Sequence, residues 1–356
     1  MGILTIIILI FSVLGGLDRI LGNRFGIGKE FEKAFMLLGT MALSMIGMIV
    51  ISPLIADLMM PVADFFYETL HIDPSIIPAS LFANDMGGAP LSVELAKNES
   101  VGSYCAMVVS SMMGCTISFT VPFALGMVGK ENHRELLLGL LCGVVTIPIG
   151  CFTGGLVSGL PILTLLLTLM PIVIISAIVA FGLLKFPELC IKIFKGFGIF
   201  ITAVITVGLC LGIINFLKGE EFIKGIATIE EGALICANAS IVLSGSLPFM
   251  YILAKVLTKP LGAVGKKIGT NEIAVAGIIS CIATSATSFG MMDKMDKKGV
   301  CMNSAFAVSG AFLIGGHLAF TMAFDQRYVF AVIVGKLVAG VTALVLSHFI
   351  YNKMYK

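Results

Sequence analysis

The sequence predicts an all-α polytopic membrane protein, and three observations lead to this fold class. Only 12% of the 356 residues are charged and 58% are hydrophobic, with a mean hydropathy of +1.06. A soluble globular protein carries about 25% charged residues, so this chain has too little polar surface to face water on every side. Long apolar stretches follow one another along the chain, and two further apolar segments are broken at their centres.

Nine stretches are long and apolar enough for full transmembrane helices, because a crossing takes about 20 residues. They are 3–22, 34–60, 99–128, 134–159, 160–184, 187–217, 230–257, 298–325 and 328–351. The first has no basic residue before it and no small-residue cleavage site at its end. That pattern indicates a retained helix rather than a signal peptide.

Two segments, 75–96 and 272–292, are apolar but interrupted by small polar residues. The first contains Ser-Leu-Phe-Ala-Asn-Asp-Met-Gly-Gly-Ala-Pro at 80–90, and the second Cys-Ile-Ala-Thr-Ser-Ala-Thr-Ser-Phe-Gly at 281–290. Gly and Pro release backbone groups from a helix, and in lipid such groups need partners inside the protein or beside a wet cavity. Each segment is therefore predicted to be a re-entrant hairpin or a discontinuous helix.

Loop charges separate re-entrant from crossing segments. If both segments are re-entrant, Lys and Arg gather on one side of the membrane, as the positive-inside rule requires. Basic loops then lie at 19–33, 130–134, 185–195, 255–267, 294–298 and 353–356, and mainly acidic loops at 64–73, 94–99, 218–231 and 325–327. Two full crossings would move the basic loops 129–134 and 185–195 outside. The re-entrant arrangement is favoured, with the N-terminus outside and the C-terminus inside.

The two halves of the chain resemble each other. A shift of 201 positions gives ten identical pairs: Lys97 with Lys298, Ser103 with Ser304, Ala106 with Ala307, Gly114 with Gly315, Phe119 with Phe320, Thr120 with Thr321, Phe123 with Phe324, Val128 with Val329, Leu136 with Leu337 and Gly139 with Gly340. The same shift lays Asn84 on Ser285, inside the two broken segments. Internal similarity of this kind indicates a structural repeat.

The repeat predicts a division of the chain into three parts. Residues 1–159 form a first repeat with its re-entrant segment at about 75–96, 160–184 a linking helix, and 185–356 a second repeat with its re-entrant segment at about 272–292. Because one span lies between them, the repeats are inverted. Secondary transporters are built this way, with the substrate site near mid-membrane where discontinuous segments meet.

Several function classes find no support in the sequence. The net charge of +2 forms no basic patch, so no nucleic-acid partner is expected. P-loop, HExxH, GxSxG and SxxK motifs are missing, so we expect no enzyme. The nine cysteines form no CxxC pair and are interpreted as small buried hydrophobic residues, so no metal site or cofactor is expected. Homo-oligomerisation is left open.

Asp85 is the leading candidate for function. A carboxylate deep in a membrane costs about 2.5–3.5 kcal/mol, so it needs a cationic partner. No Lys or Arg lies nearby in its segment, so the substrate or a coupling Na⁺ or H⁺ is the expected partner. The alternative is that Asp85 caps the next half-helix, since Asp is a favoured N-cap residue and Gly88, Ala89 and Pro90 follow.

Polar side chains at the two breaks and inside the later spans complete the candidate site. The predicted substrate-binding residues are Asn84, Asp85, Thr284, Ser285, Thr287, Ser288, His317 and Asn303. For the hydroxyl groups the alternative is close helix packing, and for His317 a hydrogen-bonded packing role. Phe82, Phe119 and Phe289 could add cation–π contacts, although core packing is the favoured role for each of them.

The run Phe82-Ala83-Asn84-Asp85-Met86-Gly87-Gly88-Ala89-Pro90-Leu91 resembles the signature of the ethanolamine-utilisation transport proteins, the EutH family. Length, hydropathy pattern and the Ala283-Thr284-Ser285 break are also similar, so the resemblance covers essentially the whole chain. It implies uptake of ethanolamine across the cytoplasmic membrane to supply an ethanolamine-degrading pathway. An aliphatic amine is a cation at pH 7, which suits a single carboxylate among neutral polar groups.

Three hypotheses follow. The first is a carrier or facilitator for ethanolamine. The second is a Na⁺- or H⁺-coupled transporter of another small polar solute, with Asp85 serving the ion. The third is a membrane sensor that binds a small molecule without moving it.

Overall fold

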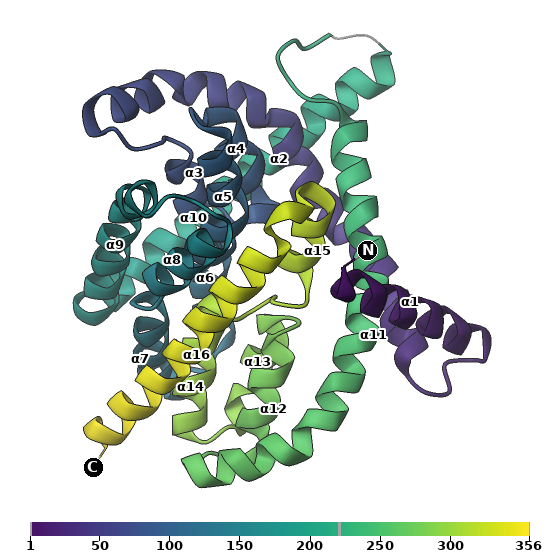
Figure 1. Ribbon diagram of the computed structural model, residues 1–356, viewed down its shortest axis with the longest axis vertical. Helices are drawn as coiled ribbons and strands as arrows, with labels where there is room; N and C mark the ends of the chain where they lie inside the picture. The colour runs from purple at the N-terminus through teal and green to yellow at the C-terminus, as the bar shows by residue number, and fades with distance from the viewer. Residues whose placement is uncertain (1, 220–221, 356) are drawn as a thin grey trace.

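The fold is a bundle of helices that vary widely in length (Figure 1). The structure, a computed structural model, describes residues 2–219 and 222–355, without the side chains of 258, 259, 261, 263, 264 and 266. No strand occurs among these residues. The all-α class predicted from the sequence is confirmed.

Eight helical runs of the described chain are long and apolar enough to cross a membrane. Five are single helices: α1 (Ile3–Ile20), α2 (Ile27–Leu70), α9 (Ile162–Lys185), α10 (Pro187–Lys218) and α11 (Ile229–Ile268). Three are composite: α5 (Glu99–Tyr104), the π-helical η2 (Cys105–Gly114) and η3 (Thr116–Thr120), and α6 (Val121–Met127); η4 (Lys130–Asn132), α7 (His133–Val144) and α8 (Ile147–Val157); and η6 (Gln326–Tyr328) with α16 (Val329–Met354).

The predicted full span 298–325 needs a correction, because the structure breaks it. It consists of α14 (Lys297–Ser309), a turn, and α15 (Gly316–Phe324). The turn contains Gly310, Gly315 and Phe312, whose φ of 59° lies in the left-handed region that interrupts a helix. The broken span lies against the second interrupted segment, and their backbones pair there.

Both interrupted segments form hairpins of short helices. The first comprises α3 (Ile76–Leu81), η1 (Asn84–Met86) and α4 (Gly88–Leu95), and the second α12 (Glu272–Cys281), α13 (Ser285–Gly290) and η5 (Met292–Lys294). In Figure 1 the first hairpin lies in the upper part of the molecule and the second in the lower part. We call them hairpin 1 and hairpin 2.

A carboxylate closes the base of each hairpin. Asp73 Oδ2 accepts hydrogen bonds from the backbone N–H groups of Lys97 (3.1 Å) and Asn98 (2.9 Å), so hairpin 1 returns to where it began. Asp296 Oδ1 accepts from the backbone N–H of Asn271 (2.7 Å) and closes hairpin 2 in the same way. Both segments therefore turn back rather than cross as single helices.

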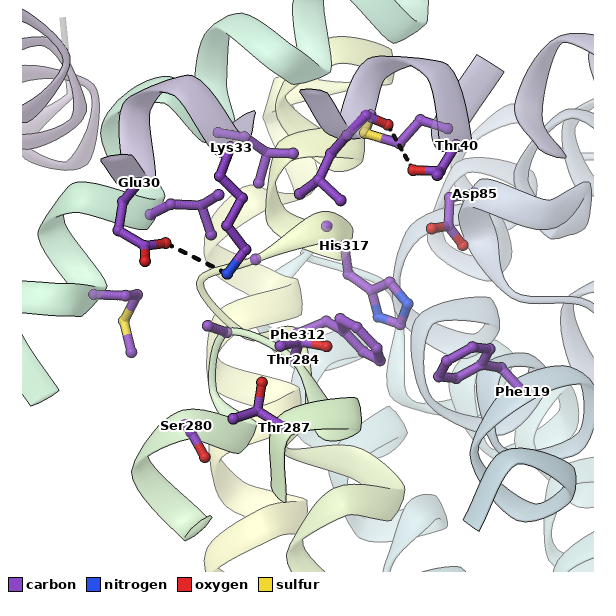
Figure 2. A pocket seen from close by; sticks show the side chains of 18 of the residues that line it. Glu30, Lys33, Thr40, Asp85, Phe119, Ser280, Thr284, Thr287, Phe312 and His317 are labelled. Atoms are coloured by element: carbon purple, nitrogen blue, oxygen red, sulfur yellow. Dashed lines mark hydrogen bonds and ion pairs between the residues drawn. The ribbon is translucent and has the colours of Figure 1, made fainter. Parts of the chain in front are cut away.

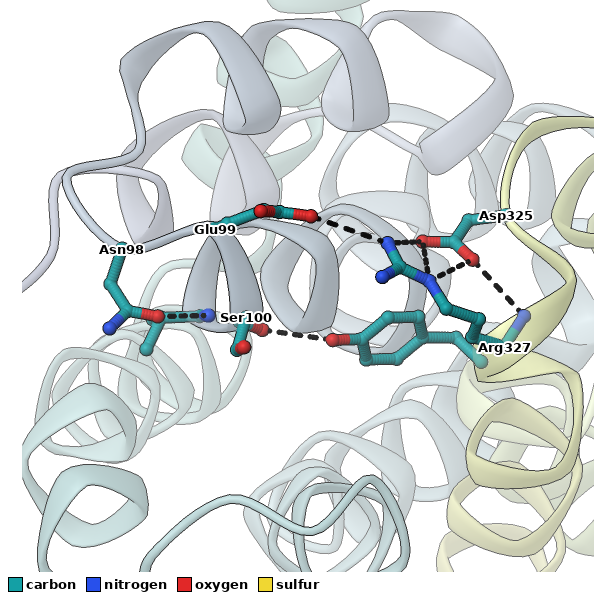
Figure 3. Close-up of polar contacts among 7 residues, drawn as sticks. Asn98, Glu99, Ser100, Asp325 and Arg327 are labelled. Carbon is teal, nitrogen blue, oxygen red and sulfur yellow. Dashed lines mark hydrogen bonds and ion pairs between the residues drawn. The ribbon is translucent and has the colours of Figure 1, made fainter.

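A polar cluster joins the start of α5 to the loop before α16 near hairpin 1 (Figure 3). Arg327 Nη2 lies 2.8 Å from Asp325 Oδ2 and 3.7 Å from Glu99 Oε1. The Tyr328 hydroxyl donates to the Ser100 carbonyl at 3.0 Å. Exposed ion pairs contribute at most about 1 kcal/mol each, so their main effect is to hold these two helix ends in register.

Equivalent glycines meet the tip of each hairpin. A Cβ on Gly114 would collide with the carbonyl oxygen of Phe82, and a Cβ on Gly315 with that of Ala283. Residues 114 and 315, like 82 and 283, are related by the 201-residue shift. These matching contacts support the division into repeats 1–159 and 185–356 linked by 160–184, which stays a prediction.

Close helix packing explains most glycines at four-residue spacing. Gly139 and Gly143 of α7 face α14, and Gly150 and Gly154 of α8 face α16, where an added Cβ would meet backbone or side-chain atoms. Gly208 of α10 lies against the Gly47 carbonyl of α2. In a membrane such small residues let backbones approach closely.

We expect Gly208→Ala to destabilise the protein, because its Cβ would enter the space of the Gly47 carbonyl and push α10 from α2. Overpacking of this kind costs about 1–3 kcal/mol. The measurement is the apparent Tm in detergent. Gly198→Ala is the matched control, since it lies in the same helix with no heavy atom within 4 Å of its added Cβ. Equal Tm values for the two variants would contradict this packing role.

The predicted topology places Glu68 outside and Lys130 inside, and both residues are exposed. A cysteine at Glu68 should react with an impermeant thiol reagent added to intact cells, and one at Lys130 only after permeabilisation. Cys210, the exposed native cysteine among nine free ones, is first replaced by Ser. The opposite labelling pattern would reverse the topology. Glu220, Glu221 and the side chains of Lys259 and Lys266, which contribute to the predicted charge pattern, lie outside the described residues.

Candidate functional site

Both hairpin tips reach one cavity of about 760 Å³ (Figure 2). Hairpin 1 contributes Asp85, and hairpin 2 contributes Thr284 and Thr287. The turn between α14 and α15 contributes Phe312, and the first turn of α15 contributes His317. The remaining wall comes from α2, α11 and the η2–η3 region; it includes Glu30, Lys33, Thr40, Met41, Ser44, Cys115, Phe119, Leu243, Leu247, Met250 and Tyr251. The two interrupted segments therefore meet at one cavity. That this cavity binds the substrate stays a prediction.

Asp85 is half-buried in η1 and lines the cavity. The cap position of α4 is Gly87, with a φ of 107°, and none of the described hydrogen bonds joins the Asp85 carboxylate to the first N–H groups of α4. The capping alternative therefore has no support in the geometry. Figure 2 shows the carboxyl group directed toward the side of the cavity where His317 lies.

Lys336 is the residue that sequence reasoning missed. It lies in α16 with 1% of its surface exposed. Its Nζ donates to the Ser111 carbonyl at 2.7 Å and lies 3.2 Å from His317 Nδ1. A lone lysine inside the apolar span 328–351 is itself a signal, because an ionisable residue within the membrane marks function by default.

His317 stands between Lys336 and the cavity. It begins the first turn of α15, is 3% exposed and lines the cavity wall. Its ring packs on Phe312 with the ring centres 4.8 Å apart. A ring held by an aromatic neighbour on one side and a lysine on the other has a fixed orientation.

The predicted polar residues in and beside hairpin 2 divide into two groups. Thr284 and Thr287 line the cavity, whereas Ser288 and Asn303 lie outside its lining. Ser288 Oγ donates to Asn303 Oδ1 at 2.8 Å, and Asn303 Nδ2 donates to the carbonyls of Ala274 and Gly299, both at 2.9 Å. These bonds tie α12, α13 and α14 together and thereby hold the threonines in place.

Asn84 and Ser285, equivalent under the 201-residue shift, are fully buried behind the cavity wall. Within the described part of the chain, neither side chain has a hydrogen-bond partner. Buried polar groups normally find partners in protein or ordered water. Their burial places them beside the site rather than on its surface.

One of the three aromatic candidates lines the cavity. Phe119 does so, stacked on Phe123 at 5.0 Å and edge-on to Phe312 at 5.7 Å. Phe82 instead packs on Phe197, and Phe289 is 2% exposed in the core. An aromatic face beside a carboxylate suits a small cation, because the ring quadrupole attracts positive charge.

The family described as "Ethanolamine utilisation protein, EutH" matches residues 2–350. A protein of Listeria monocytogenes named "Probable ethanolamine permease EutH" is 42% identical over 99% of this chain and 95% of its own length. The Escherichia coli protein of the same name is 38% identical over 96% and 93%, and "Uncharacterized protein YxeR" of Bacillus subtilis 36% identical over 94% and 90%. No solved structure matches. The described residues form eight apolar helical runs, so the chain is a multi-pass protein of the cell membrane, and it belongs to the EutH family of ethanolamine-utilisation proteins.

Proposed function

We propose that the chain transports ethanolamine, as its ammonium ion, through the cavity between the two hairpins. The observation that carries this proposal is the Asp85 carboxylate, which faces the cavity without a capping bond. The permease names of the relatives from Listeria and Escherichia support the same substrate. Ethanolammonium has three N–H donors and one hydroxyl group, so it needs one anionic acceptor and a few neutral polar groups.

The surrounding side chains fit this division of roles. Asp85 accepts from the ammonium, and the Phe119 ring adds a cation–π contact worth about 0.5–2 kcal/mol. Thr284 and Thr287 offer hydroxyl groups that both donate and accept. At about 760 Å³ the cavity also holds water around a solute this small.

Mechanistically, the proposed carrier works by exposing this cavity alternately to the two sides of the membrane. Asp73 and Asp296 fix the base of each hairpin, and the tips are hydrogen-bonded to neighbouring helices, so each hairpin is expected to move as a unit with the helices that it contacts. A Na⁺- or H⁺-coupled transporter of another solute and a non-transporting sensor remain the alternatives. Catalysis has no place in this proposal.

Uptake into sealed liposomes distinguishes these alternatives. We expect purified protein to carry radiolabelled ethanolamine inward without an imposed gradient and to exchange it for unlabelled ethanolamine. Uptake that requires a Na⁺ or pH gradient would instead establish coupling. Binding without any uptake would establish a sensor and refute the transport proposal.

Asp85→Asn should weaken ethanolamine binding, since it removes the negative charge at nearly unchanged size. Loss of one partner of a buried charge pair costs about 2–5 kcal/mol, which corresponds to an affinity lower by roughly 30-fold to several thousand-fold. The measurement is binding or uptake by folded, purified variant. Asp293→Asn is the matched control, because Asp293 is an exposed carboxylate of hairpin 2 outside the cavity lining. Wild-type affinity of Asp85→Asn would remove Asp85 from the binding site.

A further inference from the structure

Lys336 and His317 form a buried pair behind the proposed substrate site. Lys336 is 1% exposed and His317 3% exposed. A lysine ammonium is only a donor, with three N–H groups, and a buried one must use them. Two acceptors are present: the Ser111 carbonyl at 2.7 Å and His317 Nδ1 at 3.2 Å.

This contact favours one tautomer of the His317 imidazole. When the Lys336 side chain is an ammonium, Nδ1 is the acceptor of the contact and carries no proton itself. A neutral imidazole then holds its single proton on Nε2. A doubly protonated ring is disfavoured, because it would place a second positive charge against Lys336.

The protonated nitrogen belongs to a ring that lines the cavity. His317 borders the same space as Asp85, and η1, which carries Asp85, packs against α15, which carries His317. Lys336 contacts Nδ1, which leaves Nε2 as the ring nitrogen for a ligand in the cavity. The ring cannot swing freely, because Phe312 covers one face at 4.8 Å.

We propose, building on the transport of ethanolamine, that His317 donates a hydrogen bond from Nε2 to the hydroxyl oxygen of the substrate, and that Lys336 is the positioning residue that sets this tautomer. The site then selects amines that carry an oxygen acceptor. The roles of His317 as a donor and of Lys336 as a positioning residue do not follow from an amine-binding carboxylate alone. Asp85 selects charge, and the His317–Lys336 pair selects the hydroxyl group.

The pair also orients the substrate. Lys336 repels a second cation, so the ammonium turns toward Asp85 and the hydroxyl group toward His317. The hydroxyl proton remains available for a threonine hydroxyl oxygen of Thr284 or Thr287. n-Propylamine has nearly the same shape but a methyl group in place of the hydroxyl. It leaves the N–H of His317 without an acceptor where the bound amine excludes water from it, and an unpaired donor lowers the affinity.

The first test is competition of n-propylamine with radiolabelled ethanolamine in proteoliposomes. Wild-type protein should bind n-propylamine roughly 10- to 100-fold more weakly than ethanolamine, the loss expected for one buried unpaired donor. His317→Asn keeps an acceptor at the position of Nδ1 for Lys336 but removes the donor at Nε2. It should lower this preference to within about threefold, because ethanolamine loses its donor and n-propylamine no longer leaves a donor unpaired.

His317→Gln is the matched control. Its side-chain amide reaches the position of Nε2 with an N–H donor, so it should retain most of the preference. Equal loss of preference in both variants, with both folded by size-exclusion chromatography and Tm, would overturn the donor role. So would an unchanged preference in His317→Asn.

The second test reads the tautomer without any substrate. The chain has four histidines, so ¹⁵N-histidine solid-state NMR of wild type minus His317→Asn isolates the His317 signals. We expect a protonated Nε2 and an unprotonated Nδ1. Lys336→Met should move the proton to Nδ1, which then donates to the Ser111 carbonyl.

The two tests separate failure of this inference from failure of the proposed function. A protonated Nδ1 in wild type overturns the role of Lys336, whatever the protein transports. Absence of ethanolamine binding by wild type refutes the proposed function, and the hydroxyl preference falls with it. A His317 proton on Nε2 together with the predicted preferences supports both.

Discussion

The structure depends on one constraint: backbone groups inside a membrane must find hydrogen-bond partners within the protein. Two of the three interruptions meet this requirement through each other, and the third through a side chain of η3. The N–H groups of Phe312 and Ile314, in the turn between α14 and α15, donate to the carbonyls of Cys281 and Ile282 at the tip of hairpin 2. At the tip of hairpin 1 the N–H of Ala83 donates to Ser118 Oγ. Broken helices must therefore face each other, and the space between them becomes the cavity.

The same constraint governs charge. A carboxylate and an ammonium are both costly away from water. Here Asp85 lines the cavity and Lys336 lies behind His317, and no direct ion pair joins them among the described contacts. Lys336 uses its donors on a carbonyl and an imidazole instead. Asp85 consequently keeps acceptor capacity for a ligand. A direct ion pair between Asp85 and Lys336 would make the substrate-free protein more stable. A cationic substrate would then gain less binding free energy from Asp85.

The sequence predicted the membrane class, both hairpins and Asp85, because each leaves a local signature: a run of apolar residues or a break within one. It did not predict the break at 310–315. Gly310, Gly315 and Gly316 are ordinary in a membrane helix, and only contact with hairpin 2 shows why the helix ends there. Lys336 was missed for a related reason. Its partners Ser111 and His317 lie 225 and 19 positions away, so no local pattern joins them.

Sequence also could not separate the binding hydroxyls from the structural ones. Thr284, Thr287 and Ser288 share one short segment, and only the direction of each side chain in α13 sends Ser288 to Asn303 and the threonines to the cavity. Successive residues of an α-helix are rotated by about 100° about the helix axis, so adjacent polar residues face different surroundings. Residue type therefore predicts a polar site, while the packing of α13 on α14 selects its members.

The proposed repeat makes the chemistry of the two halves comparable. The 201-residue shift lays His317 on Thr116 and Lys336 on Glu135. Thr116 donates to the backbone carbonyls of Met112 and Val308, and Glu135 accepts from the Tyr355 hydroxyl, far from the cavity lining. The shared features, such as the glycines that contact the hairpin tips, are those that let the interrupted backbones pack closely. The titratable pair His317 and Lys336 is among the features that differ. A framework common to both halves thus meets the demands of the membrane, while substitutions in only one half supply a site with two unlike poles, as an asymmetric solute such as an amino alcohol requires.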